Sequence, residues 1–186
     1  TGGWRAIIGD GFTKANVRRL TAALAAKIVA EGVQDKPVVI GYDRRFLSDL
    51  AATWAAEVLV GHGIQVKLVK RSAPTPMIMY TVKRDDLSYG MAITASHNPA
   101  IYNGIKVFIE GGRDADQEAT EDLERFIAKV GDDDDIPSVD YETAKAEGQV
   151  EIINPFNDYI DSILVQIDSE AIRKAGLYVI LDPMFG

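Results

Sequence analysis

Soon after a short glycine-rich start, apolar residues recur in the sequence at the spacing of one face of an α-helix. Thr13 can cap the start of this helix with its hydroxyl, and Gly32 can close its end. The apolar face consists of Val17, Leu20, Leu24 and Ile28. We therefore predict a helix that starts after Thr13 and ends near Gly32.

Strand and helix patterns then alternate along the chain. Short apolar runs predict strands, and periodic apolar residues predict helices after Ser48 and after a double-proline turn. In chain order, we expect a strand at PVVIGYD, a helix opened by Ser48, a strand at IQVKLV, a helix at PTPMIMYTVKR and a strand at YGMAITA that ends at Ser96. The predicted apolar side of the helix opened by Ser48 consists of Leu50, Trp54, Val58 and Leu59.

This alternation predicts the fold class. Strands that alternate with helices of about ten or more residues imply a largely parallel sheet with helices on both faces. We expect an α/β fold in which a mostly parallel mixed sheet lies between helix layers. Ligands of such sheets bind beyond the carboxyl ends of the strands. Ser96 and Asp43 both follow a predicted strand, so they are candidates for a binding site.

The remaining chain predicts more of this domain and the start of another. A strand at IKVFIE precedes a charged helix from about residue 116 to 130. The acidic segment GDDDDIPS is interpreted as a solvated loop, because nothing spaces its carboxylates around a metal. We expect domain I at residues 1–148, and a linker with the truncated start of domain II at residues 149–186. That second part should contain a helix after Asn154 and a strand at Leu177–Leu181.

Composition limits the classes of function. With 186 residues, of which 47% are hydrophobic and 26% charged, the chain can form one globular domain and part of another. It starts without methionine and stops after a strand-like run, so we expect a fragment of a longer protein. No apolar run approaches the roughly 20 residues of a membrane span and no secretory signal is recognisable, which favours a cytoplasmic protein without a membrane partner.

Charge and cysteine content narrow the chemistry. The absence of cysteine excludes disulfides, cysteine nucleophiles and thiolate metal sites. The net charge of −8 argues against nonspecific binding to nucleic acid. An anionic ligand would therefore need a local cationic pocket.

Ser96 and His97 are adjacent, which raises the question of serine hydrolysis. Neighbouring side chains of an extended segment point to opposite sides, so this pair is poorly placed for a nucleophile and its base. The sequence also has no G-x-S-x-G motif, and the other histidine, His62, lies near the end of a predicted helix. An acyl hydrolase is therefore disfavoured.

A phosphate site fits the same loop better. Ser96, His97 and Asn98 offer a hydroxyl, an imidazole and an amide, and Pro99 stiffens the loop that carries them. A stiff loop favours side chains that are held in a fixed position. In addition, three cationic side chains lie near predicted strand ends or loops, and together these cations could hold an anion. These cations are Arg5, Arg45 and Lys106.

A purely structural interpretation of these residues stays open at this point. A serine at a strand end is commonly a turn former, and a single histidine is commonly structural. Lys106 could be a solvated side chain, and Arg45 could form only a local ion pair with Asp43. Residue patterns alone do not choose between this interpretation and a phosphate site.

The segment TASHNPAIYNGIKVF closely resembles the active-site loop of the α-D-phosphohexomutase family, which includes phosphoglucomutases and phosphomannomutases. The similarity extends over nearly the whole chain. TGGWRAIIGDGFT is similar to the amino-terminal segment of the family, VVIGYDRRFLS to its G-x-D-x-R segment, APTPMI to its P-T-P turn, and VILDPMFG to the start of its second domain. Gly2 departs from the pattern, because the family usually has serine there.

The resemblance implies roles for individual residues. Ser96 matches the serine that carries the phosphoryl group, and Lys106 matches the lysine that acts as general acid or base. Arg5 matches an active-site arginine, and His97 matches the loop histidine near the substrate. Asn98 and Arg45 are further candidates for binding substrate or phosphate. Positioned cations suit phosphoryl transfer, because charge develops on the phosphoryl oxygens.

The resemblance also implies a cofactor and a reaction. Family members bind Mg²⁺ through the serine phosphate and an aspartate loop, and interconvert hexose 1-phosphate and hexose 6-phosphate through a hexose 1,6-bisphosphate. Here Ser96 would be the metal contact, through its phosphate. The aspartate, sugar-selecting and distal phosphate-binding loops are not in this sequence, so we expect the chain alone to be inactive. Without the sugar-selecting loop, glucose, mannose and their amino derivatives stay open as the hexose, with glucose or mannose preferred. The alternative is a noncatalytic binding or structural domain that keeps the fold.

Overall fold

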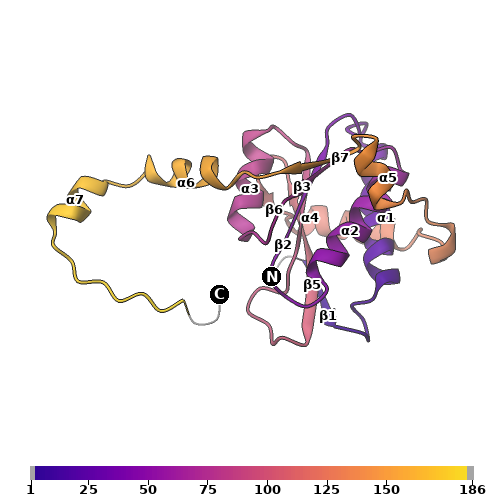
Figure 1. Ribbon diagram of the computed structural model, residues 1–186. Coiled ribbons are helices and arrows are strands. Elements are labelled where there is room, and N and C mark those ends of the chain that lie inside the picture. The colour runs from indigo at the N-terminus through magenta and orange to yellow at the C-terminus, as the bar shows by residue number, and fades with distance from the viewer. Residues whose placement is uncertain (1–2, 184–186) are drawn as a thin grey trace. The chain divides into compact units, whose positions relative to one another are not determined.

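The computed structural model describes residues 3–183 and divides the chain into two compact units, residues 1–155 and 156–186 (Figure 1). The strands of the first unit are β1 (Trp4–Ile7), β2 (Val38–Tyr42), β3 (Val66–Val69), β4 (Tyr89–Ile93), β5 (Tyr102–Ile109), β6 (Arg113–Asp114) and β7 (Val150–Ile153). Its helices are α1 (Lys14–Ala30), α2 (Ser48–Gly61), α3 (Thr75–Arg84), α4 (Gln117–Ile127), the 3-10 turn η1 (Asp133–Asp135) and α5 (Tyr141–Ala146). The second unit contains α6 (Phe156–Leu164) and α7 (Ser169–Lys174).

One mixed sheet forms the centre of the first unit. Its strand order is β1-β5-β4-β2-β3-β7, and β6 pairs with β5. The pairs among β4, β2, β3 and β7 are parallel, whereas β5 runs antiparallel to both β4 and β1. The direction of β5 follows from its connection, because the short loop between β4 and β5 cannot hold the crossover that a parallel pair requires. This confirms the predicted α/β fold with a mostly parallel mixed sheet.

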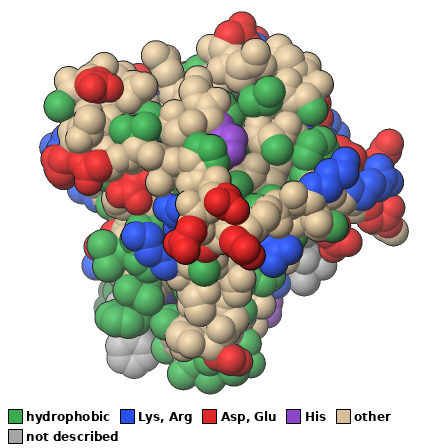
Figure 2. All heavy atoms as spheres, turned by 90° about the vertical axis from the view of Figure 1, so that its right-hand side faces the viewer, with side chains coloured by type: hydrophobic (Ala, Val, Ile, Leu, Met, Phe, Trp, Pro, Cys, Tyr) green, Lys and Arg blue, Asp and Glu red, His purple; other side chains and the backbone are tan. Residues whose placement is uncertain are grey.

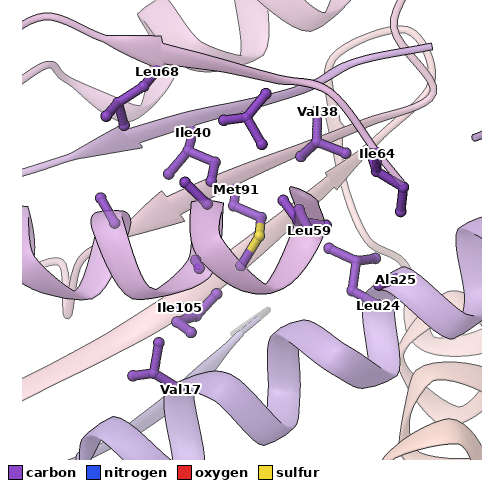
Figure 3. Close-up of a cluster of buried hydrophobic side chains, with 14 of the residues drawn as sticks. Val17, Leu24, Ala25, Val38, Ile40, Leu59, Ile64, Leu68, Met91 and Ile105 are labelled. Carbon is purple, nitrogen blue, oxygen red and sulfur yellow. The ribbon is translucent and has the colours of Figure 1, made fainter. Parts of the chain in front are cut away.

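Helices α1 and α2 cover one face of this sheet. The predicted helix start is confirmed, because the Thr13 side chain accepts a hydrogen bond from the backbone of Asn16 at 3.3 Å. Side chains from both helices and five strands meet in one apolar core (Figure 3). Its members include Val17, Leu24, Ile40, Leu59, Leu68, Met91 and Ile105. Such a core is the main stabilising contribution to the fold.

Helix α3 covers the opposite face, where two glycines allow it to approach the sheet. A Cβ atom at Gly41 would lie 2.4 Å from Ile78 Cδ1, and one at Gly90 would lie 2.5 Å from Val82 Cγ2. Figure 1 shows α3 on the side of the sheet opposite α1 and α2. The sheet is therefore covered on both faces, and its ligand-binding edge must lie at the strand ends.

Helix α4 is joined to α1 by a polar network at the amino end of β4. Lys27 Nζ donates to Glu31 Oε1 at 2.7 Å and to Asp122 Oδ2, and the Tyr89 hydroxyl donates to Glu31 Oε2 at 2.6 Å. Burial lowers the pKa of Lys27, but the hydrogen bonds to Asp122 and Glu31 outweigh it, so the net shift is upward. The pKa of Tyr89 is raised by burial and by its bond to Glu31. The network keeps Lys27 charged although it is buried.

The acidic segment after α4 is a surface loop, and Arg18 fixes it to α1. Arg18 Nε donates to Asp133 Oδ1 at 2.7 Å, and its Nη2 donates to the carbonyls of Asp133 and Ile136. Figure 2, which shows the right-hand side of Figure 1, has acidic side chains gathered near its centre with Lys and Arg side chains beside them. No group of three or more His, Cys, Asp or Glu that could hold a metal occurs within residues 3–183.

Three details differ from the sequence prediction. Residues 149–155 are not a plain linker, because Val150–Ile153 forms β7 and pairs with β3 in parallel. Leu50 does not belong to the buried side of α2, since 48% of it is exposed; the alanines Ala51, Ala52, Ala55 and Ala56 take that place. Leu177–Leu181 forms no strand, and no strand among the described residues pairs with it.

The second unit consists of α6, α7 and an extended segment. The predicted helix after Asn154 is confirmed by α6. Several apolar side chains of this unit are exposed, among them Val165, Tyr178, Ile180 and Leu181. No helix in the described part of the chain is both long and apolar enough to cross a membrane. Gly2, where the sequence departs from the family pattern, lies outside the described residues.

Candidate active site

The Ser96 loop connects β4 to β5 at the carboxyl end of the parallel strands. β4 ends at Ile93, so Ser96 follows it by three residues rather than ending the strand. Ser96 is exposed and has a φ of 55°, which lies in the left-handed region that a serine rarely adopts. Its backbone amide donates to Thr94 Oγ1 at 2.9 Å. The loop therefore presents Ser96 outward in a backbone conformation that other contacts must maintain.

Arg45 supplies most of the contacts to this loop. Its Nη2 donates to the carbonyls of Ser96 at 2.8 Å and Asn98 at 2.5 Å. Its Nη1 donates to the carbonyls of Pro99 at 2.8 Å and Tyr102 at 3.0 Å. Arg45 follows β2, the neighbour of β4 in the sheet, so its side chain spans two adjacent strand ends.

Asp43 and a buried polar pair support Arg45. Asp43 Oδ1 accepts hydrogen bonds from the Arg45 backbone amide at 2.9 Å and from Ser48 Oγ at 2.8 Å. Asp43 Oδ2 lies 3.4 Å from Arg45 Nε. Asn103 is fully buried and donates to Ser48 Oγ at 2.9 Å and to the Phe46 carbonyl at 3.0 Å. These bonds join the segment after β2 to the start of β5.

The strand register brings Lys106 and Arg5 to the same face of the sheet. Lys106 pairs with Ala92 of β4, and Arg5 pairs with Gly104 of β5, two residues before Lys106. Because directly paired residues share a face and side chains alternate along a strand, both cations lie on the face that α3 covers. Lys106 Nζ lies 3.3 Å from Asp114 Oδ1 of β6, and 20% of its side chain is exposed. Lys106 is therefore an anchored cation on the strand that follows the Ser96 loop.

His97 and Asn98 lie in the loop itself. His97 is exposed beside Ser96, and Asn98 is half-buried, with its backbone amide bonded to the carbonyl of Ala95 at 3.0 Å. The structure thus gathers Ser96, His97 and Asn98 in one loop, with Arg45 beneath it and the strands of Lys106 and Arg5 next to it. All of the predicted candidates lie on two neighbouring loops and on the strands beside them.

Three contributing residues were not among the sequence candidates: Thr94, Asn103 and Asp114. Thr94 could have been noticed as a hydroxyl two residues before Ser96, in the position of a local side-chain cap. The polar Asn103, at the start of an apolar strand, was a signal for a buried hydrogen-bonding role. The pairing of Asp114 with Lys106 depends on the β5–β6 turn and has no signal in the residue pattern.

The arrangement can hold a phosphoryl group on Ser96 and place cations near it. A phosphoserine carries about −1.5 to −2 charges at neutral pH. Lysine and arginine donors are the groups that stabilise phosphoryl oxygens. If Ser96 carried a phosphate, its oxygens could supply one ligand to a divalent metal; the described residues contain no group of three or more His, Cys, Asp or Glu that could supply the others.

The fold and site together define an α/β/α domain with an exposed serine loop at the carboxyl ends of its parallel strands. The sequence matches the family model "Phosphoglucomutase/phosphomannomutase, alpha/beta/alpha domain I" over residues 1–134. The chain belongs to this family, as its domain I.

Individual relatives of this chain carry names from the same family. The chain is 31% identical over 177 residues to a phosphoglucomutase of Staphylococcus saprophyticus, covering 91% of this chain and 32% of that protein. It is 37% identical over 133 residues to a probable phosphomannomutase of Haemophilus influenzae, covering 67% of this chain and 27% of that protein. The chain thus matches 32% and 27% of the length of these two relatives.

Solved structures show the same fold. A crystal structure of a putative phosphomannomutase from Thermus thermophilus superposes with a TM-score of 0.79 at 28% identity, covering 92% of this chain and 36% of that one. The Paramecium phosphoprotein pp63/parafusin also gives a TM-score of 0.79, at 17% identity, covering 93% of this chain and 35% of that one. The latter similarity supports the fold alone.

Proposed function

We propose that this chain is the phosphoryl-carrying domain of a phosphohexomutase, which interconverts hexose 1-phosphate and hexose 6-phosphate. The observation that carries the proposal is the Ser96 loop. Its serine is exposed at the carboxyl end of β4, in a left-handed conformation, with Lys106 on the next strand. Membership in the phosphoglucomutase/phosphomannomutase family supports a hexose phosphate as the substrate class.

The reaction would proceed by two phosphoryl transfers. In the first, a sugar hydroxyl oxygen attacks the phosphorus of phosphoserine, the bond from phosphorus to Ser96 Oγ breaks, and the hydroxyl loses its proton. Ser96 Oγ gains a proton as it leaves, and the product is a hexose 1,6-bisphosphate. In the second transfer, the serine takes back the other phosphoryl group by the reverse steps, so that the phosphoserine is restored.

The residues of this chain would have different roles in the two transfers. Lys106 would exchange the proton, which suits a lysine because it can exist in both protonation states. Arg5 and His97 would bind the phosphoryl oxygens or the sugar, and Asn98 can offer an amide from the same loop. A bound Mg²⁺ would neutralise charge on the phosphoryl oxygens, with the Ser96 phosphate as the ligand from this chain.

The test uses the full-length protein that carries this domain, because the 186-residue chain spans about a third of its relatives and we expect it to show no turnover by itself. Ser96→Ala should lower turnover of glucose 1-phosphate or mannose 1-phosphate by several orders of magnitude, since no atom remains to carry the phosphoryl group. Mass spectrometry of the wild-type protein, after incubation with hexose 1,6-bisphosphate, should find phosphate on the Ser96 peptide. His62→Ala serves as the control, because His62 lies at the end of α2.

A folded Ser96→Ala protein with activity within tenfold of wild type would contradict the proposal. So would a wild-type protein that turns over neither substrate. Circular dichroism of both variants controls for the fold.

A further inference from the structure

We propose that Arg45 is a positioning residue that holds the Ser96 loop in its active conformation and does not bind phosphate. The inference rests on the proposed function only in taking Ser96 as the phosphoryl carrier. It changes the role expected for Arg45 from the sequence, where this arginine was a candidate for binding substrate or phosphate.

The first step concerns the donors of Arg45. A guanidinium has five N–H groups in a fixed planar arrangement. Nη2 is bonded to the carbonyls of Ser96 and Asn98, and Nη1 to the carbonyls of Pro99 and Tyr102. The Nε–H faces Asp43 Oδ2 at 3.4 Å. Four of the five donors are thus hydrogen-bonded to the Ser96 loop and the fifth faces Asp43, so the guanidinium is directed at the loop backbone and not at a phosphate oxygen.

The second step concerns the loop. The four carbonyls belong to residues 96, 98, 99 and 102, so one side chain contacts the loop from its serine to the start of β5. Ser96 has a φ of 55°, a left-handed backbone conformation that costs about 1–2 kcal/mol of free energy. Such a conformation persists only where surrounding contacts fix it. Charge-assisted hydrogen bonds from Arg45 are strong enough to do so.

The third step concerns how Arg45 itself is fixed. Asp43 accepts from its backbone amide and faces its Nε–H, and Ser48 Oγ donates to the same carboxylate. Only 14% of the Arg45 side chain is exposed, and Ser48 is fully buried. The end of β2 therefore acts as the fixed support, and the Ser96 loop is the part that is held.

The fourth step is a consequence for lysine. A lysine at this position would keep the charge, but its three donors on one nitrogen cannot reach four carbonyls spread over seven residues in the way a planar guanidinium does. If Arg45 bound phosphate as a simple cation, lysine would restore much of its effect. Arg45→Lys therefore separates positioning from charge.

The first experiment measures the loop in the 186-residue chain, by hydrogen–deuterium exchange of peptides that cover residues 94–103. Arg45→Ala and Arg45→Lys should each raise the exchange rate of the loop amides by about tenfold or more, because the loop loses its charge-assisted bonds. Peptides from α3 should be unchanged. Arg44→Ala is the matched control, since Arg44 is the neighbouring arginine and bonds to Ser72 Oγ at 3.3 Å. Loop exchange equal to that of Arg44→Ala would overturn the proposal.

The second experiment measures kinetics in the full-length protein. Both Arg45 variants should lower kcat by about 100-fold with KM for the hexose 1-phosphate within about threefold of wild type, because a misplaced nucleophile slows chemistry without removing a substrate contact. A large rise in KM that Arg45→Lys restores would overturn the proposal in favour of direct phosphate binding. If wild-type protein shows no turnover, the proposed function fails, while the exchange experiment still decides whether Arg45 holds the loop.

Discussion

Lys106 is held at the candidate site by an acidic partner from the next strand. Its ammonium lies 3.3 Å from Asp114 Oδ1, and its strand pairs with β4 just before the Ser96 loop. In the sequence, Lys106 lies among apolar residues, which is compatible either with a solvated side chain or with a residue of the site. The structure adds that Lys106 is only 20% exposed and anchored, which supports a positioned role.

Substituting Lys106 tests whether it transfers a proton. In the full-length protein, Lys106→Ala should lower kcat by about 10²–10⁴-fold, the contribution of a general acid or base. Lys106→Arg should be nearly as slow, because an arginine keeps the charge but does not deprotonate. Lys36→Ala, at an exposed ion pair with Asp86, is the control. Recovery of most activity by Lys106→Arg would instead indicate a purely electrostatic role.

The role of Arg45 shows where prediction from the sequence stops. The position of Ser96 beyond a strand end follows from the apolar pattern, and so does the stiffness that Pro99 gives the loop. The acceptors of Arg45, however, are backbone carbonyls 51 to 57 positions further along the chain. Backbone carbonyls occur at every residue, so no residue type in the sequence marks these four as partners.

Among the elements, the strands at the sheet edges were the hardest to predict. The central strands β2 and β4 consist almost entirely of buried residues and appear in the sequence as continuous apolar runs. β7 has exposed positions at Glu151 and Ile152 and only four residues, so its pattern resembles a linker. On α2, Val58 and Leu59 are buried as predicted, but Leu50 was wrongly assigned to the buried side because the closest packing of this helix uses alanines, whose small side chains weaken the hydrophobic periodicity.

The end of α3 is joined to β3 through Asp85, which gives a prediction on stability. Asp85 accepts hydrogen bonds from Arg84 Nε and from Lys67 Nζ, both at 2.7 Å. Burial raises the pKa of this carboxyl, but the bonds from Arg84 and Lys67 outweigh it and the net shift is downward. A lowered pKa in the folded state means that the ionised carboxylate stabilises the fold.

Asp85→Asn should therefore lower the free energy of unfolding of the 186-residue chain by about 1 kcal/mol at pH 7. The difference from wild type should be constant above the pKa of an unfolded aspartate, about 4, and should shrink as the pH falls below it. Urea unfolding at several pH values measures this. Asp86→Asn, at an 80% exposed carboxylate, should have little effect at any pH. An Asp85→Asn difference that does not depend on pH would show that the carboxylate charge is not the cause.

At the scale of the whole molecule, the sheet and its helix layers are complete within the first unit. All paired strands of the described chain lie between Trp4 and Ile153. The sequence anticipated a division of the chain and placed it at residue 148, seven positions before the division in the structure. The two positions differ because β7 belongs to the first unit. β7 pairs with β3, about eighty positions earlier, and the local sequence pattern does not reveal this pairing.

A chain that ends at Pro155 should consequently fold as well as the 186-residue chain. Its melting temperature should lie within about 2 °C of the longer one, since the truncation removes no residue of the sheet or of the core. Differential scanning calorimetry measures this. A second truncation after Gly148, which removes β7, is the comparison and should lower the melting temperature by several degrees. A large loss of stability in the chain that ends at Pro155 would show that residues 156–186 contribute to the first unit.

The short loop between β4 and β5 also sets an order of events in folding. Ser96, Lys106 and Asp114 lie on a continuous run of antiparallel chain, from β4 through β5 to β6. Closing such short loops costs little entropy, whereas β1 must find β5 from almost a hundred residues away. The serine and its lysine are therefore expected to meet early, on a hairpin that forms by local contacts. Arg5 would join them late, when the edge strand closes the sheet.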